Sequence, residues 1–131
     1  MKTIRTAPRL LLSAILLGVA LVSAASAPAA RFHTRLVKSN PSKDTVLAAA
    51  PAQLELWFSE KIDLAASRVQ LVDAAQAAVA TAPITRNDAV ADAPVVARVT
   101  GAMKSGTYTV NWSAASGDGH PVRGSYSFQV K

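Results

Sequence analysis

The chain contains two histidines, and these residues carry most of the chemistry that its sequence offers. His33 follows an apolar N-terminal stretch, and His120 lies in the segment Asp118-Gly119-His120-Pro121, close to the C-terminus. If that segment is extended, the Asp118 carboxylate and the His120 imidazole leave the same face and can meet one ion. Nitrogen and oxygen donors in a planar set suit Cu(II). The alternative is that Asp118 only caps the turn through its own backbone.

The first thirty residues have the layout of a secretory signal peptide. Three basic residues precede the apolar run 10–22, and small residues then continue to Ala30. The apolar run is too short to span a bilayer comfortably, although a retained membrane anchor is the alternative. We expect residues 1–30 to be removed, with cleavage as late as residue 32, and residues 31–131 to form one domain outside the cytoplasm.

The composition excludes several kinds of partner and ligand. Three of the fourteen basic residues and none of the eight acidic ones lie in the leader, so the rest of the chain has a net charge of only +3. Its basic residues are scattered singly, which does not favour nucleic-acid binding. Cysteine is absent and Met103 is the one methionine after Met1, so neither a disulfide nor a soft Cu(I) site is expected.

The pattern after Thr34 is typical of short strands separated by turns, with no convincing helix. Leu54, Leu56 and Phe58 alternate with polar or amphipathic neighbours, as a half-buried strand requires. Tyr108 is placed like the tyrosine corner of sandwich folds. The alanine-rich stretch 74–82 is interpreted as a turn and a weak strand. These features predict an all-β, antiparallel, immunoglobulin-like β-sandwich. The clearest predicted strands are 54–58, 68–72, 94–99, 106–112 and 125–130, with a loop over 117–124.

Several phrases, in this order and spacing, closely resemble the CopC family of periplasmic copper-binding proteins. The resemblance spans the chain from His33 onward and is most specific from Gly106 to Val130; the phrases are His33-Thr34-Arg35-Leu36-Val37, Phe58-Ser59-Glu60, Gly106-Thr107-Tyr108-Thr109-Val110-Asn111-Trp112 and Asp118-Gly119-His120-Pro121-Val122-Arg123-Gly124. It implies a Greek-key sandwich or barrel with one Cu(II) ion. Because residues 74–91 contain no methionine, the chain resembles the shorter members, which have a single Cu(II) site.

The resemblance also implies the ligands. In the family, a histidine at the mature N-terminus supplies its α-amine and its imidazole, and an Asp-x-His turn completes the equatorial set. Carried over to this chain, these positions are His33, Asp118 and His120. The family's Phe-Ser-Glu glutamate corresponds to Glu60, in an axial or outer-shell role. A solvated loop carboxylate is the alternative for Glu60.

The position of His33 leaves the donor set open. Phe32 precedes it, whereas signal peptidase prefers small side chains at the scissile bond. Cleavage after Ala30 would give Arg31-Phe32-His33, and a histidine in third place can bind Cu(II) through the amine, two backbone amides and its imidazole. That arrangement would make Asp118 and His120 unnecessary. An earlier cut would leave His33 as an internal ligand.

Three functions remain open. The first is a monomeric, non-enzymatic periplasmic protein that buffers copper, or delivers it to an inner-membrane transporter of the CopD type, in copper homeostasis and resistance. The second is an oxidase that activates oxygen at a histidine-brace copper. The third is an immunoglobulin-like interaction module that binds no metal.

Overall fold

The computed structural model describes residues 33–117 and 119–131, and every regular element in these ranges is a β-strand. We find there no helix of the length and apolarity that a bilayer crossing requires. The strands are β1 (Leu36–Asn40), β2 (Val46–Leu47), β3 (Gln53–Phe58), β4 (Asp63–Asp73), β5 (Ala78–Val79), β6 (Val95–Arg98), β7 (Gly106–Ala115) and β8 (Pro121–Val130).

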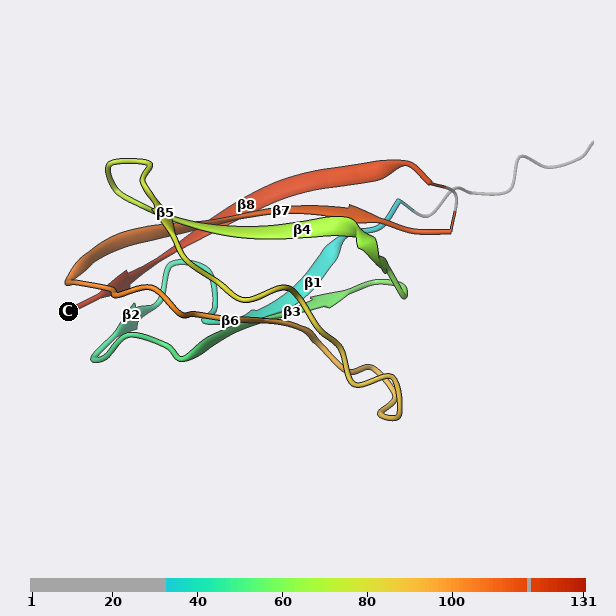
Figure 1. Ribbon diagram of the computed structural model, residues 1–131, viewed down its shortest axis with the longest axis horizontal. Coiled ribbons are helices and arrows are strands. Elements are labelled where there is room, and N and C mark those ends of the chain that lie inside the picture. The colour runs from blue at the N-terminus through green and yellow to red at the C-terminus, as the bar shows by residue number, and fades with distance from the viewer. Residues whose placement is uncertain (1–32, 118) are drawn as a thin grey trace, which may run out of the picture. The chain divides into compact units, whose positions relative to one another are not determined.

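These strands form two facing sheets (Figure 1). One sheet has the order β1-β3-β6, and the other has the order β2-β8-β7-β4-β5. The chain crosses repeatedly from one sheet to the other, as in a Greek-key sandwich. The predicted all-β sandwich is therefore confirmed. One pairing departs from a purely antiparallel fold, because β2 lies parallel to β8, with Val46 opposite Gln129.

The strongest sequence signal forms the longest hairpin. Strands β7 and β8 stay in register without interruption from Gly106 opposite Val130 to Ala115 opposite Pro121. The loop predicted over 117–124 is too long, since β8 already begins at Pro121. Proline is acceptable there because it occupies the first position of a strand. The sequence missed this extension because glycine and proline are disfavoured in strands, whereas pairing with β7 continues through them.

The alanine-rich stretch behaves as its composition predicts. The Asp73 carboxylate accepts hydrogen bonds from the backbone N–H groups of Ala75 and Ala77, both at 2.9 Å, and so closes a tight turn. Strand β5 follows the turn and pairs with β4 through Leu71 and Val72. The interpretation as a turn and a weak strand is confirmed.

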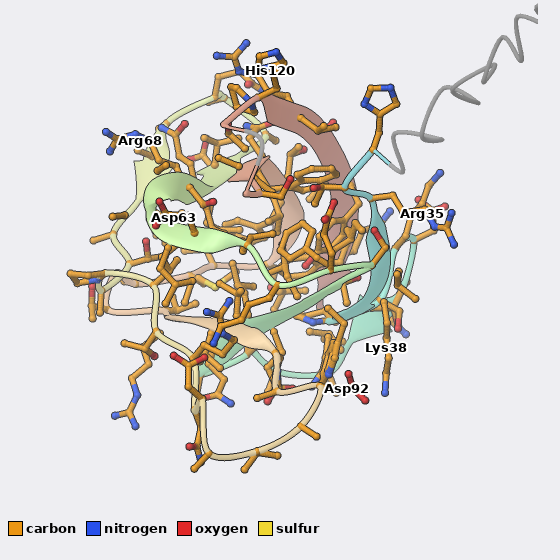
Figure 2. The ribbon with its side chains drawn as sticks, turned by 90° about the vertical axis from the view of Figure 1, so that its right-hand side faces the viewer. Arg35, Lys38, Asp63, Arg68, Asp92 and His120 are labelled. Atoms are coloured by element: carbon orange, nitrogen blue, oxygen red, sulfur yellow. The ribbon has the colours of Figure 1, made fainter. Side chains whose placement is uncertain are left out.

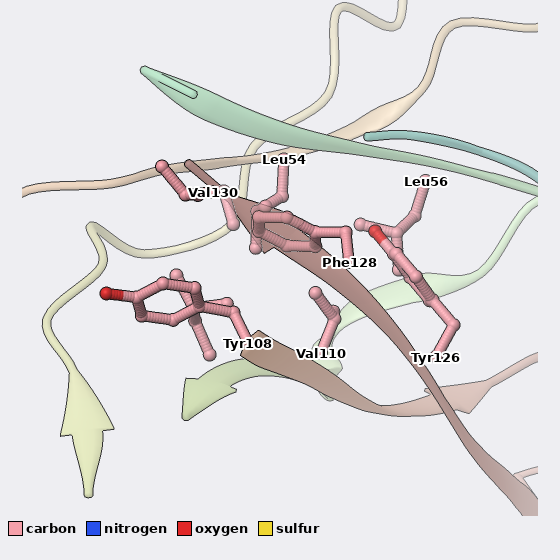
Figure 3. Close-up of a cluster of buried hydrophobic side chains, with 9 residues drawn as sticks. Leu54, Leu56, Tyr108, Val110, Tyr126, Phe128 and Val130 are labelled. Carbon is pink, nitrogen blue, oxygen red and sulfur yellow. The ribbon is translucent and has the colours of Figure 1, made fainter. Parts of the chain in front are cut away.

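Alternating side chains from the two sheets meet in one core (Figure 3). Leu54 and Leu56 of β3 are fully buried, and they face Val110 of β7 and Phe128 of β8, which are 0% and 1% exposed. This is the period-two packing that the sequence predicts, and it fixes the sandwich because apolar burial is the main favourable term in folding. The buried cluster comprises Leu54, Leu56, Leu71, Ala97, Tyr108, Val110, Tyr126, Phe128 and Val130.

The two tyrosines of the core differ in how their hydroxyls are satisfied. The Tyr108 hydroxyl donates to the Lys104 carbonyl and accepts from the Lys104 N–H, both at 2.8 Å. This tie to the backbone four residues upstream confirms the predicted tyrosine corner. By contrast, the buried Tyr126 hydroxyl meets no hydrogen-bond partner among the described residues.

Removing each of these two hydroxyls in turn gives a matched test of the hydrogen-bond assignment. Tyr108→Phe is expected to lower the free energy of unfolding by about 1–3 kcal/mol, because both backbone groups of Lys104 lose a partner. Tyr126→Phe removes an unsatisfied hydroxyl, so it is expected to be neutral or stabilising. Urea unfolding of both variants checks this; an equal loss in the two would contradict the hydrogen-bond assignment.

Candidate metal centre

The turn between β7 and β8 carries one of the two histidines. The Gly119 N–H donates to the Ser116 carbonyl at 2.9 Å, and Gly119 has a φ of 75°, a conformation that favours glycine. The chain therefore turns at Gly119 and does not run extended there. His120 follows at once, exposed at the surface and directly before the start of β8. Asp118 lies outside the described residues.

The other histidine lies at the entry to β1, beside a well-anchored segment. His33 is exposed, whereas the next residue, Thr34, is only 3% exposed. The Thr34 Oγ1 hydroxyl donates to Glu60 Oε1 at 2.6 Å. Two further bonds join Arg35 and Ser59: the Arg35 N–H donates to Ser59 Oγ at 3.1 Å, and the Ser59 N–H donates to the Arg35 carbonyl at 2.9 Å.

These contacts place the predicted residue Glu60 next to the His33 segment, although the two are far apart in sequence. Glu60 directly follows Ser59, and its carboxylate is exposed apart from the bond to Thr34. This geometry favours a role in which Glu60 orients the chain around His33. Thr34 is a residue that sequence reasoning missed. Its only sequence signal is its position after His33, and its bond partner lies 26 residues away.

The start of the described chain and the β7–β8 connection lie at the same end of the sandwich (Figure 1). Figure 2 looks onto this end of the molecule and labels both His120 and Arg35, which lies in the segment that leads into β1. The edge-to-face contact of Phe58 (β3) with Trp112 (β7), whose ring centroids are 5.4 Å apart, joins the two sheets. The segments that carry His33, Glu60 and His120 therefore lie at one end of the sandwich, but these three side chains do not form a group close enough to hold a metal ion.

The described part of the chain contains no group of three or more histidine, aspartate or glutamate side chains close enough together to hold a metal ion. Asp118, one of the three predicted equatorial ligands, is not among the residues searched. The imidazoles of His33 and His120 are donors of the type that Cu(II) prefers. Both residues are exposed at the surface, where an ion can reach them.

A cavity of about 310 Å³ also borders Glu60, between the β3–β4 connection and the loop before β6. Three of its charged side chains, Lys61, Arg86 and Asp88, are paired with one another. Arg86 Nε donates to Asp88 Oδ1 at 2.7 Å, and Arg86 Nη1 donates to the Ile62 carbonyl at 3.0 Å. The hydrogen bond from Arg86, followed by that from Lys61, holds the pKa of the Asp88 carboxyl below its usual value. These pairings indicate that the cavity wall is structural.

Comparison with known proteins gives consistent matches. The CopC domain model matches residues 36–131. Copper resistance protein C of Pseudomonas syringae pv. tomato is 38% identical over 106 residues, covering 78% of this chain and 83% of that protein.

Two solved structures are similar over most of their length. PcoC, a methionine-rich copper resistance protein from Escherichia coli, has a TM-score of 0.66 and 31% identity, covering 76% of this chain and 99% of the other. CopC from Methylosinus trichosporium OB3b has a TM-score of 0.68 and 26% identity, covering 76% and 94%. Unlike a methionine-rich relative, the chain has only Met103 after Met1, and that side chain is half-buried against the core.

Proposed function

Because the chain belongs to the CopC family, we propose that it is a periplasmic Cu(II)-binding protein of copper homeostasis and resistance. In this proposal it binds one Cu(II) ion as a monomer, and it buffers copper or delivers it to an inner-membrane transporter of the CopD type. The observation that supports this most is that its only two histidines lie at the same end of the sandwich, at the β1 entry and in the β7–β8 turn.

The proposed ligands are His33, Asp118 and His120, with Glu60 in the outer shell. An α-amine and an imidazole on one residue form a chelate, so only one residue has to be ordered to supply two donors. The Asp118 carboxylate offsets part of the ionic charge. Three nitrogens and one oxygen suit the tetragonal preference of Cu(II). Such a set lacks a sulfur ligand to tune the redox potential, which favours storage or delivery over electron transfer.

The proposal includes a leader over residues 1–30, with cleavage as late as residue 32, followed by a copper-binding domain over 31–131; residues 1–32 and Asp118 lie outside the described residues. The position of the cut decides the donors. If His33 becomes the first residue, its amine joins the site. If Arg31 is first, the amine, two backbone amides and the His33 imidazole give four nitrogens without His120.

The test is made on protein recovered from the periplasm. Its intact mass identifies the first residue, and titration with Cu(II) gives the stoichiometry. Electron paramagnetic resonance of the loaded protein then reports the nitrogen donors. One equivalent of copper with three nitrogens and one oxygen supports the proposed set. Four nitrogens indicate the alternative N-terminal chelate, and no binding at micromolar Cu(II) refutes the proposed function and favours a metal-free module.

A carrier is distinguished from a histidine-brace oxidase by its chemistry with oxygen. We propose that the chain is not an enzyme, so the copper-loaded protein should consume little oxygen in the presence of ascorbate. Sustained turnover above that of free copper would show that the bound ion has an open position and would favour the oxidase.

Thr34 gives a more specific prediction about how Glu60 acts. Thr34→Val keeps the buried shape but removes the donor to Glu60 Oε1. Since outer-shell partners orient metal ligands, the Cu(II) affinity is expected to fall by about tenfold. The matched control is Thr109→Val, which breaks the 2.9 Å hydroxyl contact with Ser127 in the middle of the β7–β8 hairpin. Competition titration with a copper chelator measures both; an equal effect of the two substitutions would exclude a specific role for Thr34.

A further inference from the structure

Strand β8 has an edge that is only partly covered. On the side away from β7, the Ser127 carbonyl accepts from the Asp44 N–H at 2.8 Å, and the Gln129 N–H donates to the Thr45 carbonyl at 2.9 Å. Because the backbone groups of a strand alternate in direction, those of Arg123 and Ser125 point to this same side. Strand β2 pairs only with Gln129 and Val130, so the edge is open before Ser127 in the described part of the chain.

The open edge borders a gap between the two sheets. A cavity of about 690 Å³ is lined on one side by β1 and the following turn, and on the other by Trp112, Gly124 and Tyr126. Gly124 is needed at this wall, because a Cβ there would overlap the Trp112 indole ring. We call this gap the β1–β8 groove. It begins at Thr34, the residue after His33.

The charges along the groove have one sign. Arg35, Lys38 and Lys43 line it, and no acidic side chain does so among the described residues. Figure 2 shows Arg35 and Lys38 projecting outward from this side of the molecule. Lys38 is held over the Trp57 ring, with its Nζ 4.6 Å from the ring centroid. Trp57 belongs to β3 and does not line the groove, so this contact directs the Lys38 ammonium toward β3. The uniformly basic lining nevertheless favours an acidic occupant.

The buried wall of the groove contains the unsatisfied hydroxyl of the core. Tyr126 is 5% exposed, lines the groove, and its hydroxyl has no hydrogen-bond partner among the described residues. Burial raises the pKa of this phenol, an effect that the nearby Ser39 side chain partly offsets. A buried hydroxyl without an acceptor is unfavourable. Its oxygen is closed off from solvent, so an occupant of the groove would meet the other lining residues.

We propose that the β1–β8 groove binds an extended acidic segment of a partner polypeptide, which adds as a strand to the open edge of β8. The backbone groups of Arg123 and Ser125 pair with the segment, while Arg35, Lys38 and Lys43 contact its carboxylates. This is the β-augmentation mode of peptide recognition, in which main-chain bonds supply affinity and side chains supply selectivity. The proposal does not depend on copper, and it places the partner beside the His33 segment.

The probe is a capped peptide of alternating glutamate and valine, added to the metal-free, ¹⁵N-labelled protein and followed by amide chemical shifts. We expect shifts and slowed exchange at Arg123 and Ser125, with binding that weakens as salt increases. A peptide of alternating lysine and valine, and an acidic peptide with N-methylated backbone amides, should each bind at least about tenfold more weakly. Equal binding of the acidic and basic peptides would overturn the proposal.

Two variants separate charge from backbone pairing. Lys38→Glu with Lys43→Glu should weaken the acidic peptide at least about tenfold, whereas Arg98→Glu with Lys104→Glu, the same charge change at exposed positions away from the groove, should have a much smaller effect. Ser125→Pro removes the outward N–H and should abolish binding, with folding checked by near-ultraviolet circular dichroism. Retained binding in folded Ser125→Pro, or concentration-dependent self-association through this edge in place of peptide binding, would refute it.

Discussion

Substituting His120 by alanine is expected to lower the Cu(II) affinity at least about 100-fold while leaving the fold intact. Loss of outer-shell partners alone typically costs a metal site 10–100-fold, so loss of a ligand should cost at least the upper end of that range. The fold should be unaffected because His120 is exposed in a turn, where substitutions usually change stability by less than about 0.5 kcal/mol. Chelator competition measures the affinity, and thermal unfolding measures the stability.

Two further substitutions complete this experiment. Arg123→Ala is the control, because Arg123 is an exposed neighbour on β8 whose guanidinium remains protonated and cannot ligate the ion. Its affinity should equal that of the unmodified protein. His33→Ala should match His120→Ala if both imidazoles bind the same ion. A large loss in His33→Ala with none in His120→Ala would instead identify the N-terminal chelate, in which His120 takes no part.

Phe128→Ala is expected to cause the largest loss of stability, about 3–5 kcal/mol. Phe128 is 1% exposed, and its ring stacks on that of Tyr108 with a centroid distance of 5.9 Å. It projects from β8 into the same core cluster as Leu54 and Leu56 of β3. Truncation leaves a cavity between the two sheets. Neither sheet can move to fill it without disturbing the pairing of its strands. A domain of this size has a total stability of about 5–15 kcal/mol, so the variant should be partly unfolded near physiological temperature.

Gln129→Ala is the matched control for this prediction. Gln129 is the next residue of the same strand, and its side chain is exposed. Its contribution to pairing with the β2 region comes from the backbone N–H, which the substitution retains. The loss should stay within about 0.5 kcal/mol. Guanidinium unfolding followed by tryptophan fluorescence gives both values. A cost below about 1 kcal/mol for Phe128→Ala would mean that the core is not packed as described.

The sequence predicted correctly those features that depend on residues close together along the chain, and it missed features that depend on distant ones. Leu54 and Leu56, and likewise Tyr108 and Val110, could be assigned to the core because period-two alternation is a local property of a strand. The tyrosine corner at Tyr108 could be predicted for the same reason, since its partner Lys104 lies four residues away. By contrast, the start of β8 at Pro121 depends on continued pairing with β7, which its local composition opposes.

The candidate site divides in the same way. The types of donor, imidazole and carboxylate without sulfur, follow from composition, and the resemblance to the CopC family implies His33, Asp118, His120 and Glu60 as the residues that carry them. The structure places His33, His120 and Glu60 at one end of the sandwich, and it adds Thr34, which no local pattern indicated. The ligand set itself stays a prediction, with Asp118 outside the described residues.

By itself, the sequence determined the strands, the alternating core and the donor chemistry, because each depends on residue type and on neighbours a few positions away. Only the tertiary structure decided that Thr34 meets Glu60 across 26 residues, and that β1 and β8 leave a basic groove between them. Such contacts join segments that are distant along the chain. They are set by how two sheets pack and where their edges fall, and no local pattern of residues encodes this.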